Sequence, residues 1–469
     1  MDQDKFNDFF IDQSQFLVSI KTRTVFMKVI QFSLIGILTL ITILWFGVSA
    51  NEIAASQGVF AWRSVLLQFT GILAMTSLSI GILLAMRFTW VEDKLNGLDK
   101  VYRLHKWLGV TGLVFVISHW LLVNVTKWLV DGGLLIKPAR VPKPPETVEI
   151  FKFFNSQRDA AEQIGEFACY VLVALIAIAL IKRFPYRYFF MSHRWIAIVY
   201  LSLIFHAVVL MNHSYWGTII GVVMASLMLF GLYAALNSLF RRIGQSRKAV
   251  GEVSTINYLD GVKVNAISIQ LKSKWPGHFP GQFAFITFDR HEGAHPFSIT
   301  SAWLNDGKLS FLIKVLGDYT STISSKVKVG DYVLIEGPYG RFNFESNANK
   351  QIWIGGGIGI TPFIARMKAL AISSDGRQID LFHSTSDIDE AALDLLKEDA
   401  NSANVCLHVL IDSRDGHLTG EILRAKIPNW KAADIWFCGP MAFGKAIRSD
   451  LIEHGLYENK FHQELYDMR

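Results

Sequence analysis

The sequence predicts a chain in two halves, a membrane all-α six-helix bundle followed by a cytoplasmic antiparallel β-barrel and an α/β nucleotide-binding domain. Composition is the first indication, because 51% of the 469 residues are hydrophobic and only 18% are charged, which is too apolar for one ordinary soluble domain. The second is a change in pattern near Arg241, where long apolar runs give way to polar loops and Gly/Pro turns. We therefore expect at least two domains.

Charge and cysteine content exclude several classes of protein. The net charge is +6, but the basic residues flank apolar segments, which argues against a nucleic-acid partner. The three cysteines, Cys169, Cys406 and Cys438, are far apart, so neither a disulfide framework nor a Cys-x-x-Cys metal or iron–sulfur site is available. Residues 1–12 lack the pattern of a cleaved signal peptide, so the first apolar run should remain in the mature protein.

Six apolar stretches are candidates for membrane spans, since a bilayer core needs about 20 helical residues. The fourth and fifth are short, which implies tilt, local thinning or a misplaced end. The six stretches are 29–48, 64–86, 107–125, 164–181, 195–211 and 215–236.

Basic residues concentrate at one set of span ends, which the positive-inside rule places in the cytoplasm. Six spans then place both termini in the cytoplasm, with the chain in the cell (inner) membrane. The loop 127–162 also carries Lys137, Arg140 and Lys143, but acidic residues partly balance them and long loops have little influence on topology. Residues 1–24 have apolar residues at helical spacing, which predicts an amphipathic interfacial helix, with disorder as the alternative.

Four histidines are the most informative residues of the spans. His105 and His119 belong to the third span, and His193 and His206 to the fifth. Their separations of 14 and 13 residues correspond to about 21 Å and about 19.5 Å of helix. Matched depths pair His105 with His193 near the inner surface and His119 with His206 near the outer one. Each pair can supply both axial nitrogens of a haem iron, so we predict two b-type haems.

In a straight helix, the two histidines of the fifth span would point from different faces. At about 100° per residue, fourteen positions return to nearly the same helix face but thirteen do not. The fifth helix must therefore tilt, bend or present its two rings differently. His213 lies seven residues after His206 and is the alternative outer ligand, although it falls in the expected headgroup region.

The second half reads as two soluble domains. Short β-rich runs predict a small antiparallel barrel, at 251–258, 262–271, 282–288, 308–314 and 332–336. Strands then alternate with helices, as in a doubly wound parallel sheet, at 351–354, 379–383, 405–411 and 434–438. The predicted boundaries are 1–24 for the amphipathic segment, 25–242 for the membrane domain, 248–346 for the barrel and 349–469 for the α/β domain.

The first strand of the α/β domain leads directly into a glycine-rich turn and a helix. The turn reads Gly355-Gly356-Gly357-Ile358-Gly359-Ile360-Thr361-Pro362. Glycines let the backbone approach a pyrophosphate, and the helix N-terminus offers free N–H donors. The last glycine of the usual dinucleotide fingerprint is replaced by Pro362, which the first turn of a helix tolerates.

Several short motifs then occur in the order seen in ferredoxin–NADP reductase-like modules. They are His295-Pro296-Phe297-Ser298-Ile299-Thr300-Ser301, Gly317-Asp318-Tyr319-Thr320, Glu336-Gly337-Pro338-Tyr339-Gly340, the glycine-rich turn and Phe437-Cys438-Gly439-Pro440. Together with the four histidines, they make residues 88–469 resemble the ferric reductase and NADPH oxidase superfamily.

The resemblance implies roles for individual residues. The residues lining FAD would be His295, Pro296, Phe297, Ser298 and Thr300, with Ser298 near the flavin N5, and those facing its pyrophosphate would be Gly317 and Thr320. The nucleotide phosphates would lie in the turn formed by Gly355, Gly357, Gly359, Thr361 and Pro362. Cys438 and Gly439 would sit beside the nicotinamide. Tyr466 would take the place of the family's terminal aromatic over the flavin, although Asp467, Met468 and Arg469 follow it here. Ser298, Cys438 and Tyr466 are thus the candidate catalytic residues.

The function that these features predict is electron transfer from cytoplasmic NAD(P)H through FAD and two haems to an external small-molecule acceptor. Oxygen, giving superoxide, and a ferric chelate remain alternatives. Arg414 follows the third parallel strand and could pair with a 2′-phosphate, which favours NADPH over NADH. Other possible functions are reduction of membrane quinone or of a periplasmic protein, and a non-catalytic haem-binding redox sensor. Membrane lipid is the other expected partner.

Overall fold

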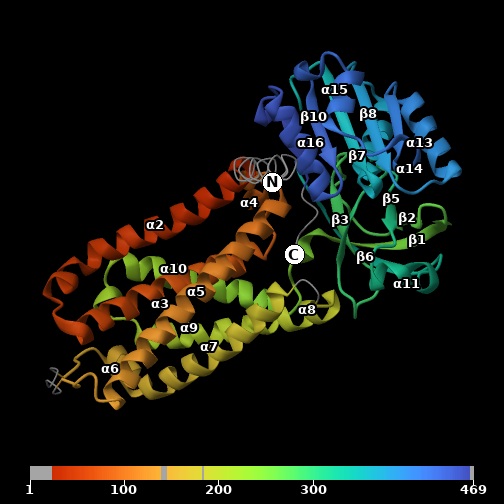
Figure 1. Cartoon of the computed structure of the whole chain (residues 1–469). Helices are drawn as coiled ribbons and strands as arrows, with labels where there is room; N and C mark the ends of the chain where they lie inside the picture. The colour runs from red at the N-terminus through yellow and green to blue at the C-terminus, as the bar shows by residue number, and fades with distance from the viewer. Residues whose placement is uncertain (1–23, 139–144, 182–183, 465–469) are drawn as a thin grey trace, which may run out of the picture. The chain divides into compact units, whose positions relative to one another are not determined.

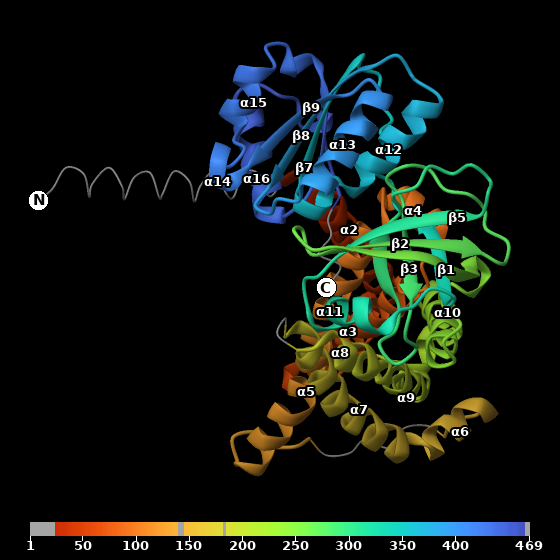
Figure 2. The ribbon, with the colours of Figure 1, turned by 90° about the vertical axis from the view of Figure 1, so that its right-hand side faces the viewer.

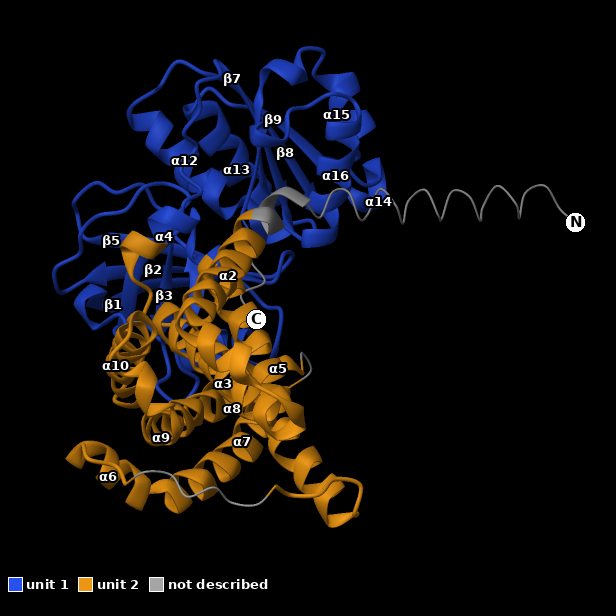
Figure 3. Cartoon of the chain, turned by 90° about the vertical axis from the view of Figure 1, so that its left-hand side faces the viewer, with its two compact units in different colours: residues 1–27, 92–100, 244–468 blue, residues 28–91, 101–243, 469 orange. Residues whose placement is uncertain are grey.

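The computed structural model describes residues 24–138, 145–181 and 184–464. The chain divides into two compact units (Figure 3). We call residues 28–91 and 101–243 the membrane unit, and residues 92–100 together with those from 244 onward the reductase unit. The predictions for the amphipathic segment 1–24, apart from Thr24, and for Arg140, Lys143 and Tyr466 lie outside the described residues.

Among the described residues, the membrane unit contains six helical spans long and apolar enough to cross a bilayer, drawn in red to green in Figure 1. This confirms the prediction of six spans and of an integral membrane protein. The spans are α2 (Thr24–Ala55), α3 (Gly58–Leu84), α5 (Leu98–Asp131), α7 (Arg158–Leu180), α8 (Tyr186–His193) with α9 (Trp195–Leu210), and α10 (Ile219–Leu239).

Helix ends differ from the apolar runs because polar residues continue the helices beyond the hydrocarbon region. The third span begins at Leu98, not near residue 107, so His105 lies well inside α5. The fifth begins at Tyr186 and is interrupted at Arg194, where α8 ends and α9 begins. Two short helices, α4 (Thr89–Leu95) and α6 (Glu149–Ser156), were not predicted.

The membrane unit exposes large apolar side chains on its surface, as a protein embedded in lipid does. Phe32, Phe167 and Leu229 are 69%, 70% and 64% exposed, although large apolar side chains normally avoid water. Inside, α9 packs closely on α7 and α10, and α3 packs on α10, whereas the backbones of α5 and α9 are not closely packed. Contacts between α5 and α9 therefore depend on long side chains.

The first part of the reductase unit is the predicted antiparallel barrel. Its strands are β1 (Lys248–Leu259), β2 (Val264–Leu271), β3 (Phe283–Thr287), β4 (His295–Ser298), β5 (Lys308–Lys314) and β6 (Tyr332–Tyr339), in the order β4-β3-β6-β1-β2-β5. A bridge between Ile299 and Phe311 links the two edges, and Thr300 N–H donates to the Ser310 carbonyl at 2.8 Å. The helix α11 (Asp318–Lys326) lies between β5 and β6 in the chain.

The second part is the predicted parallel α/β domain. Its strands are β7 (Lys350–Gly356), β8 (Gln378–Thr385), β9 (Cys406–Ile411), β10 (Asp434–Cys438) and β11 (Phe461–Gln463), in the order β11-β10-β7-β8-β9. The order reverses at β7, so a ligand crevice is expected at its carboxyl end.

Helices cover both faces of this parallel sheet, as Figure 2 shows. One face packs on α12 (Thr361–Ile372) and α13 (Glu390–Ser402), and the other on α15 (Gly420–Lys426) and α16 (Met441–Glu453). A single-turn helix, α14 (Asp412–Asp415), follows β9.

The segment 92–100 belongs to the reductase unit because it contacts the end of β6. Gly340 N–H donates to Glu92 Oε1 at 2.7 Å, and Arg341 forms an ion pair with Asp93. Burial, the largest cause, raises the pKa of Glu92. The predicted boundary at residue 242 does not anticipate this segment, since it precedes the barrel by about 150 residues in the sequence.

Candidate functional site

The four predicted histidines form two facing pairs in the membrane unit. The ring centroids of His105 and His193 are 5.9 Å apart at an interplanar angle of 69°, and those of His119 and His206 are 6.2 Å apart at 78°. Two imidazoles that bind one metal ion through bonds of about 2.0 Å have centroids roughly 6 Å apart. The spacing of both pairs therefore fits a shared iron.

Three of the four rings are anchored by backbone carbonyls of other helices. The Nδ1 atoms lie 2.7 Å from Gly81 O for His105, 3.1 Å from Leu67 O for His119 and 2.8 Å from Ala161 O for His206. Because a carbonyl oxygen only accepts, each Nδ1 carries the proton and Nε2 keeps its lone pair. Metal-bound histidines have this arrangement in most proteins, so the donor set suits a bis-histidine site.

His193 is held differently. Its Nδ1 is buried without a hydrogen-bond partner among the described residues, and its ring stacks on Phe189 with centroids 5.1 Å apart. An unsatisfied buried ring nitrogen is costly in the absence of a ligand. This residue therefore also fits a site that a bound group completes.

The interruption at Arg194 resolves the difference in helix face between His193 and His206. His193 ends α8 and His206 lies within α9, so a straight helix need not bring both rings to one face. His213, the alternative outer ligand, lies in a 3₁₀ turn instead. Its Nδ1 is 3.2 Å from Glu146 Oε2 and its ring stacks on Phe151 at 4.3 Å. The structure thus places His206, not His213, opposite His119.

Glycines make room for these rings, and their positions do not stand out in the sequence. A Cβ at Gly165 would lie 1.9 Å from His206 Nδ1, and one at Gly71 would lie 3.5 Å from His119 Cε1. Gly165 thus lets the His206 ring approach the backbone of α7. Within an apolar run, a glycine at this position is indistinguishable from ordinary helix packing.

The predicted flavin residues lie on β4 and immediately after it. On β4, Ser298 pairs with Phe283 of the neighbouring strand β3, and Pro296 pairs with Phe285 of β3. Because β4 is an edge strand, Pro296 costs no ladder hydrogen bond on its free side. Ser298 and Thr300 are buried, at 7% and 2% exposed.

His295 and Tyr319 form a stacked pair beside these residues. Their ring centroids are 4.1 Å apart at 22°. Burial lowers the pKa of His295 to about 4 and raises that of Tyr319 to about 12. Both rings are therefore neutral at pH 7 and form a flat surface.

The N-terminus of α11 contains the other two predicted flavin residues. Thr320 Oγ1 accepts from the backbone N–H groups of Leu316 at 2.9 Å and Gly317 at 3.1 Å. A side chain at Gly317 would meet no atom within 4 Å, so the backbone there is open to a ligand. The Thr320 hydroxyl stabilises the turn that precedes the helix.

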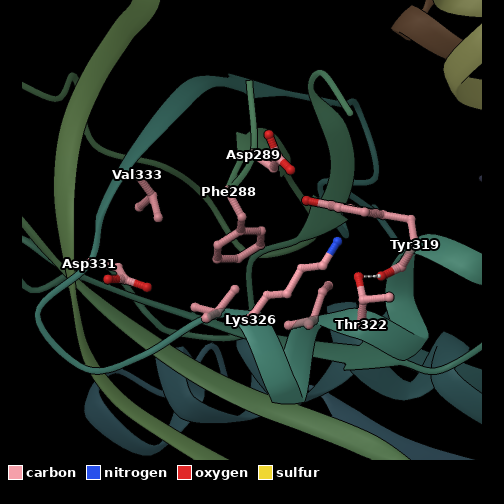
Figure 4. A pocket seen from close by; sticks show the side chains of 9 residues that line it. Phe288, Asp289, Tyr319, Thr322, Lys326, Asp331 and Val333 are labelled. Atoms are coloured by element: carbon pink, nitrogen blue, oxygen red, sulfur yellow. Dashed lines mark hydrogen bonds between the residues drawn. The ribbon is translucent and has the colours of Figure 1, made fainter. Parts of the chain in front are cut away.

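A cavity of about 190 Å³ lies against the other side of α11. Figure 4 shows the ammonium end of Lys326 pointing toward Tyr319, and Phe288, Asp289 and Asp331 also line the cavity. Neither Gly317 nor Thr320 lines it. A cavity of this size is smaller than most cofactor pockets, so it can hold only part of a ligand.

The glycine-rich turn packs directly on the end of β10. Cys438 pairs with Gly355 across the sheet, and a Cβ at Gly359 would lie 2.2 Å from the Cys438 carbonyl oxygen. Gly357 has a φ of +54°, and a Cβ there would meet nothing within 4 Å. Gly359 therefore serves close backbone packing, while Gly357 faces open space where a phosphate could bind.

The remaining predicted nucleotide residues differ widely in exposure. Cys438, Thr361 and Pro362 are buried, with Cys438 at 0% exposed in the core against α12. The neighbouring Gly439 has a φ of +158°, and a Cβ there would lie 3.0 Å from Gly356 Cα.

Arg414 lies on α14 with an exposed side chain, where it forms an ion pair with Asp415. Its Nε and terminal nitrogen are 3.0 Å and 2.9 Å from the two carboxylate oxygens. The structure brings the glycine-rich turn and the Cys438-Gly439 segment together, whereas the ligand roles of these residues stay predictions.

Comparison with known proteins agrees with this architecture. A ferric reductase like transmembrane component matches residues 70–204, and an FAD-binding domain matches residues 251–343. The chain has the domain combination of the ferric reductase and NADPH oxidase superfamily. The transmembrane match includes His105, His119 and His193 and ends two residues before His206. The chain thus combines a ferric reductase-like membrane domain with an FAD-binding domain.

Individual relatives each match only a share of this chain. Ferric reduction oxidase 8, mitochondrial, of Arabidopsis thaliana is 28% identical over 284 residues, which cover 57% of this chain and 35% of that protein. The toluate 1,2-dioxygenase electron transfer component of Pseudomonas putida is 26% identical over 229 residues, covering 46% of this chain and 68% of that one. The chain therefore spans about a third of the length of the plant relative.

Two further similar proteins each match less than half of this chain. A flavohemoprotein of Bordetella pertussis is 25% identical over 220 residues, which cover 41% of this chain and 53% of that protein. The solved structure of the ferredoxin reductase in carbazole 1,9a-dioxygenase aligns with a TM-score of 0.41 and 20% identity, covering 47% of this chain and 69% of that one.

Proposed function

We propose that this chain carries electrons from cytoplasmic NAD(P)H, through FAD and two b-type haems, to an acceptor on the other side of the membrane. The observation that supports this most strongly is the presence of two facing histidine pairs, in one chain with an FAD-binding domain and a parallel nucleotide-binding fold. When bound, the flavin would turn a two-electron donor into single electrons, which the haems would carry across the apolar core.

The membrane unit would hold two irons through the Nε2 atoms of His105, His119 and His206 and through a ring nitrogen of His193. His105 with His193 would form the inner site, and His119 with His206 the outer one. The carbonyls of Gly81, Leu67 and Ala161 fix the proton on the other ring nitrogen, and so keep Nε2 available as a ligand. The lipid-facing apolar side chains keep water from the path.

The reductase unit would bind the flavin and the nicotinamide nucleotide at neighbouring strand ends. Ser298 and Thr300 would offer hydroxyls to the flavin, and the neutral His295–Tyr319 pair would offer an apolar surface. Gly357 and the backbone of the glycine-rich turn that leads into α12 would bind the nucleotide phosphates. Cys438 and Gly439 would close this site, since the end of β10 packs on the turn.

For the nucleotide itself, we favour NADPH. Arg414 lies just beyond the carboxyl end of β9, and in doubly wound folds an arginine near the ribose accommodates a 2′-phosphate. Its exposed side chain, now paired with Asp415, has the planar guanidinium that suits a 2′-phosphate.

Placing the nucleotide site in the cytoplasm follows from the distribution of basic residues at the span ends. Both termini would then be cytoplasmic, and the histidine pair nearer the opposite surface would face an external acceptor. Oxygen and ferric chelates are the acceptors that we propose, because either needs only access to the outer haem.

Anaerobic reduction of the purified full-length protein tests this function. Under argon, NADPH should bleach and shift the oxidised haem Soret band in protein loaded with FAD. Admission of oxygen, or of ferric citrate in a second sample, should restore the oxidised spectrum and identify the acceptor. A flavin that is reduced while the haem spectrum stays oxidised would contradict electron transfer and support the redox-sensor alternative.

A further inference from the structure

A cysteine, a histidine and an aspartate meet at the amino ends of β8 and β9. Cys406 Sγ lies 3.6 Å from His408 Nε2, which lies 2.9 Å from Asp380 Oδ1, and all three donor atoms are within 4.8 Å of one another. Cys406 is exposed, while His408 and Asp380 are 19% and 12% exposed in their side chains. The cluster is thus reachable from solvent and partly sheltered.

The register of the sheet builds this cluster. Asp380 pairs with Cys406, and Phe382 with His408, across the parallel strands. Because side chains alternate along a strand, residues 380, 406 and 408 share one face. That face is the one that packs on α15 and α16. Three donors therefore project from rigid backbone, which is what a preformed metal site requires.

We propose that Cys406, His408 and Asp380 form a binding site for a zinc-like divalent cation. Thiolate, imidazole and carboxylate are the three ligand types that zinc takes in proteins. With zinc bonds of about 2.3 Å to sulfur and about 2.0 Å to nitrogen and oxygen, tetrahedral geometry separates sulfur from nitrogen by roughly 3.5 Å and nitrogen from oxygen by roughly 3.3 Å. The observed distances of 3.6 Å and 2.9 Å are close to these values.

Neighbouring side chains orient two of the three proposed ligands, as groups next to metal ligands usually do. Lys350 Nζ lies 3.1 Å from Asp380 Oδ2, so this oxygen is occupied and Oδ1 is presented to the cation. The His408 ring stacks on Phe382 with centroids 4.5 Å apart, which fixes its orientation. A cavity of about 470 Å³ borders Cys406 and Asp380 and offers room for a water ligand in the fourth position.

Binding would exchange a proton for the cation. The S–H bond breaks, the S–Zn bond forms and the proton passes to solvent, without any change of oxidation state.

The site is separate from the proposed nucleotide site. Asp380 and Cys406 lie at the amino ends of their strands, whereas the glycine-rich turn follows the carboxyl end of β7. The cation would therefore not take part in hydride transfer. It would join the edge strand β9 to β8 and stabilise the nucleotide-binding domain, because a ligand that binds only the folded state raises its stability.

Zinc binding to the full-length protein tests the proposal. After treatment with a chelator and dialysis against zinc alone, the wild type should retain one more zinc per chain than Cys406→Ser. Zinc K-edge absorption, which haem iron does not obscure, should show a sulfur neighbour at about 2.3 Å that is lost in Cys406→Ser. His408→Ala should weaken zinc binding at least tenfold.

His417→Ala is the matched control, because His417 also contacts an aspartate of this domain, with its Nδ1 3.2 Å from Asp412 Oδ1, but without a nearby thiol. It should retain zinc as the wild type does. NADPH-dependent flavin reduction should be equal in wild type and variants, which establishes that each variant is folded. Equal zinc retention in wild type, Cys406→Ser and His408→Ala, or a wild-type zinc without a sulfur neighbour, would overturn the site.

Discussion

The two units of this chain build their candidate sites in opposite ways. In the membrane unit, single side chains from distant parts of the sequence face one another, and the carbonyls of other helices orient them. In the reductase unit, backbone turns at strand ends form the site, and the residues of each motif are neighbours in sequence. The difference implies that one substitution can remove a whole site in the membrane unit. In the reductase unit, one substitution should weaken ligand binding without abolishing the site.

The largest effect is expected for His119→Ala. It removes one ligand of the proposed outer pair, and it should abolish one of two haems and lower electron transfer to the external acceptor by about 100-fold or more. Haem content and the acceptor-reduction rate measure this. His213→Ala is the control, because His213 contacts Glu146 and Phe151 instead of His119. Haem loss in His213→Ala with retention in His119→Ala would reverse the assignment of the outer pair.

Gly165→Ala tests the support of a ligand in the same unit. The added methyl would lie 1.9 Å from His206 Nδ1, so the ring must move and lose its bond to the Ala161 carbonyl. We expect about tenfold weaker haem retention at the outer site. Gly47→Ala is a matched change in α2, where a Cβ meets nothing within 4 Å. Equal haem retention in the two variants would show that the His206 ring does not depend on this close approach.

In the reductase unit, Arg414→Ala should have a graded and selective effect. Loss of a charged contact to the 2′-phosphate should raise the KM for NADPH by about tenfold and leave the KM for NADH unchanged. Asp415→Ala, which frees Arg414 from its ion pair, should lower the KM for NADPH or leave it unchanged. Equal changes for both nucleotides in Arg414→Ala would remove this residue from the role.

The smallest effect concerns the pH dependence of the barrel. Because burial lowers the pKa of His295 to about 4 from an ordinary 6.5, the unfolded state binds the proton more readily than the folded state. The stability of the barrel should therefore be full above pH 6.5 and decrease as the pH falls toward 4. Thermal unfolding followed by flavin fluorescence measures this decrease.

His295→Gln should make the loss of stability shallower. His278, a buried residue of the barrel whose pKa is also lowered by burial, supplies the remaining slope. An unchanged slope in His295→Gln would show that His295 does not titrate in this way.

The two units also differ in what could be predicted from their sequence. The six spans, the barrel, the parallel sheet and the matched depths of the four histidines follow from local patterns. The helix interruption at Arg194 is a bend in the fifth span. The spacing of His193 and His206 allowed a bend, a tilt or a different presentation of the two rings, and did not distinguish among them. The strands β4 and β11 are too short to carry a pattern, and α11 is too polar to show one.

What the sequence could not provide are contacts between distant segments. The carbonyl partners of the histidines are backbone atoms, so no residue type marks them. Cys406 and His408 are visible as neighbours, but Asp380 joins them only through the register of β8 and β9. A search for Cys-x-x-Cys spacing therefore passes over this cluster.

A pyridine haemochrome count on the purified full-length protein tests the central proposal most directly. Two b-type haems per chain in the wild type, and one in His119→Ala, are the result that we predict. No haem, or a haem content that is the same in the wild type and in His119→Ala, would contradict the assignment of the facing histidine pairs as iron ligands.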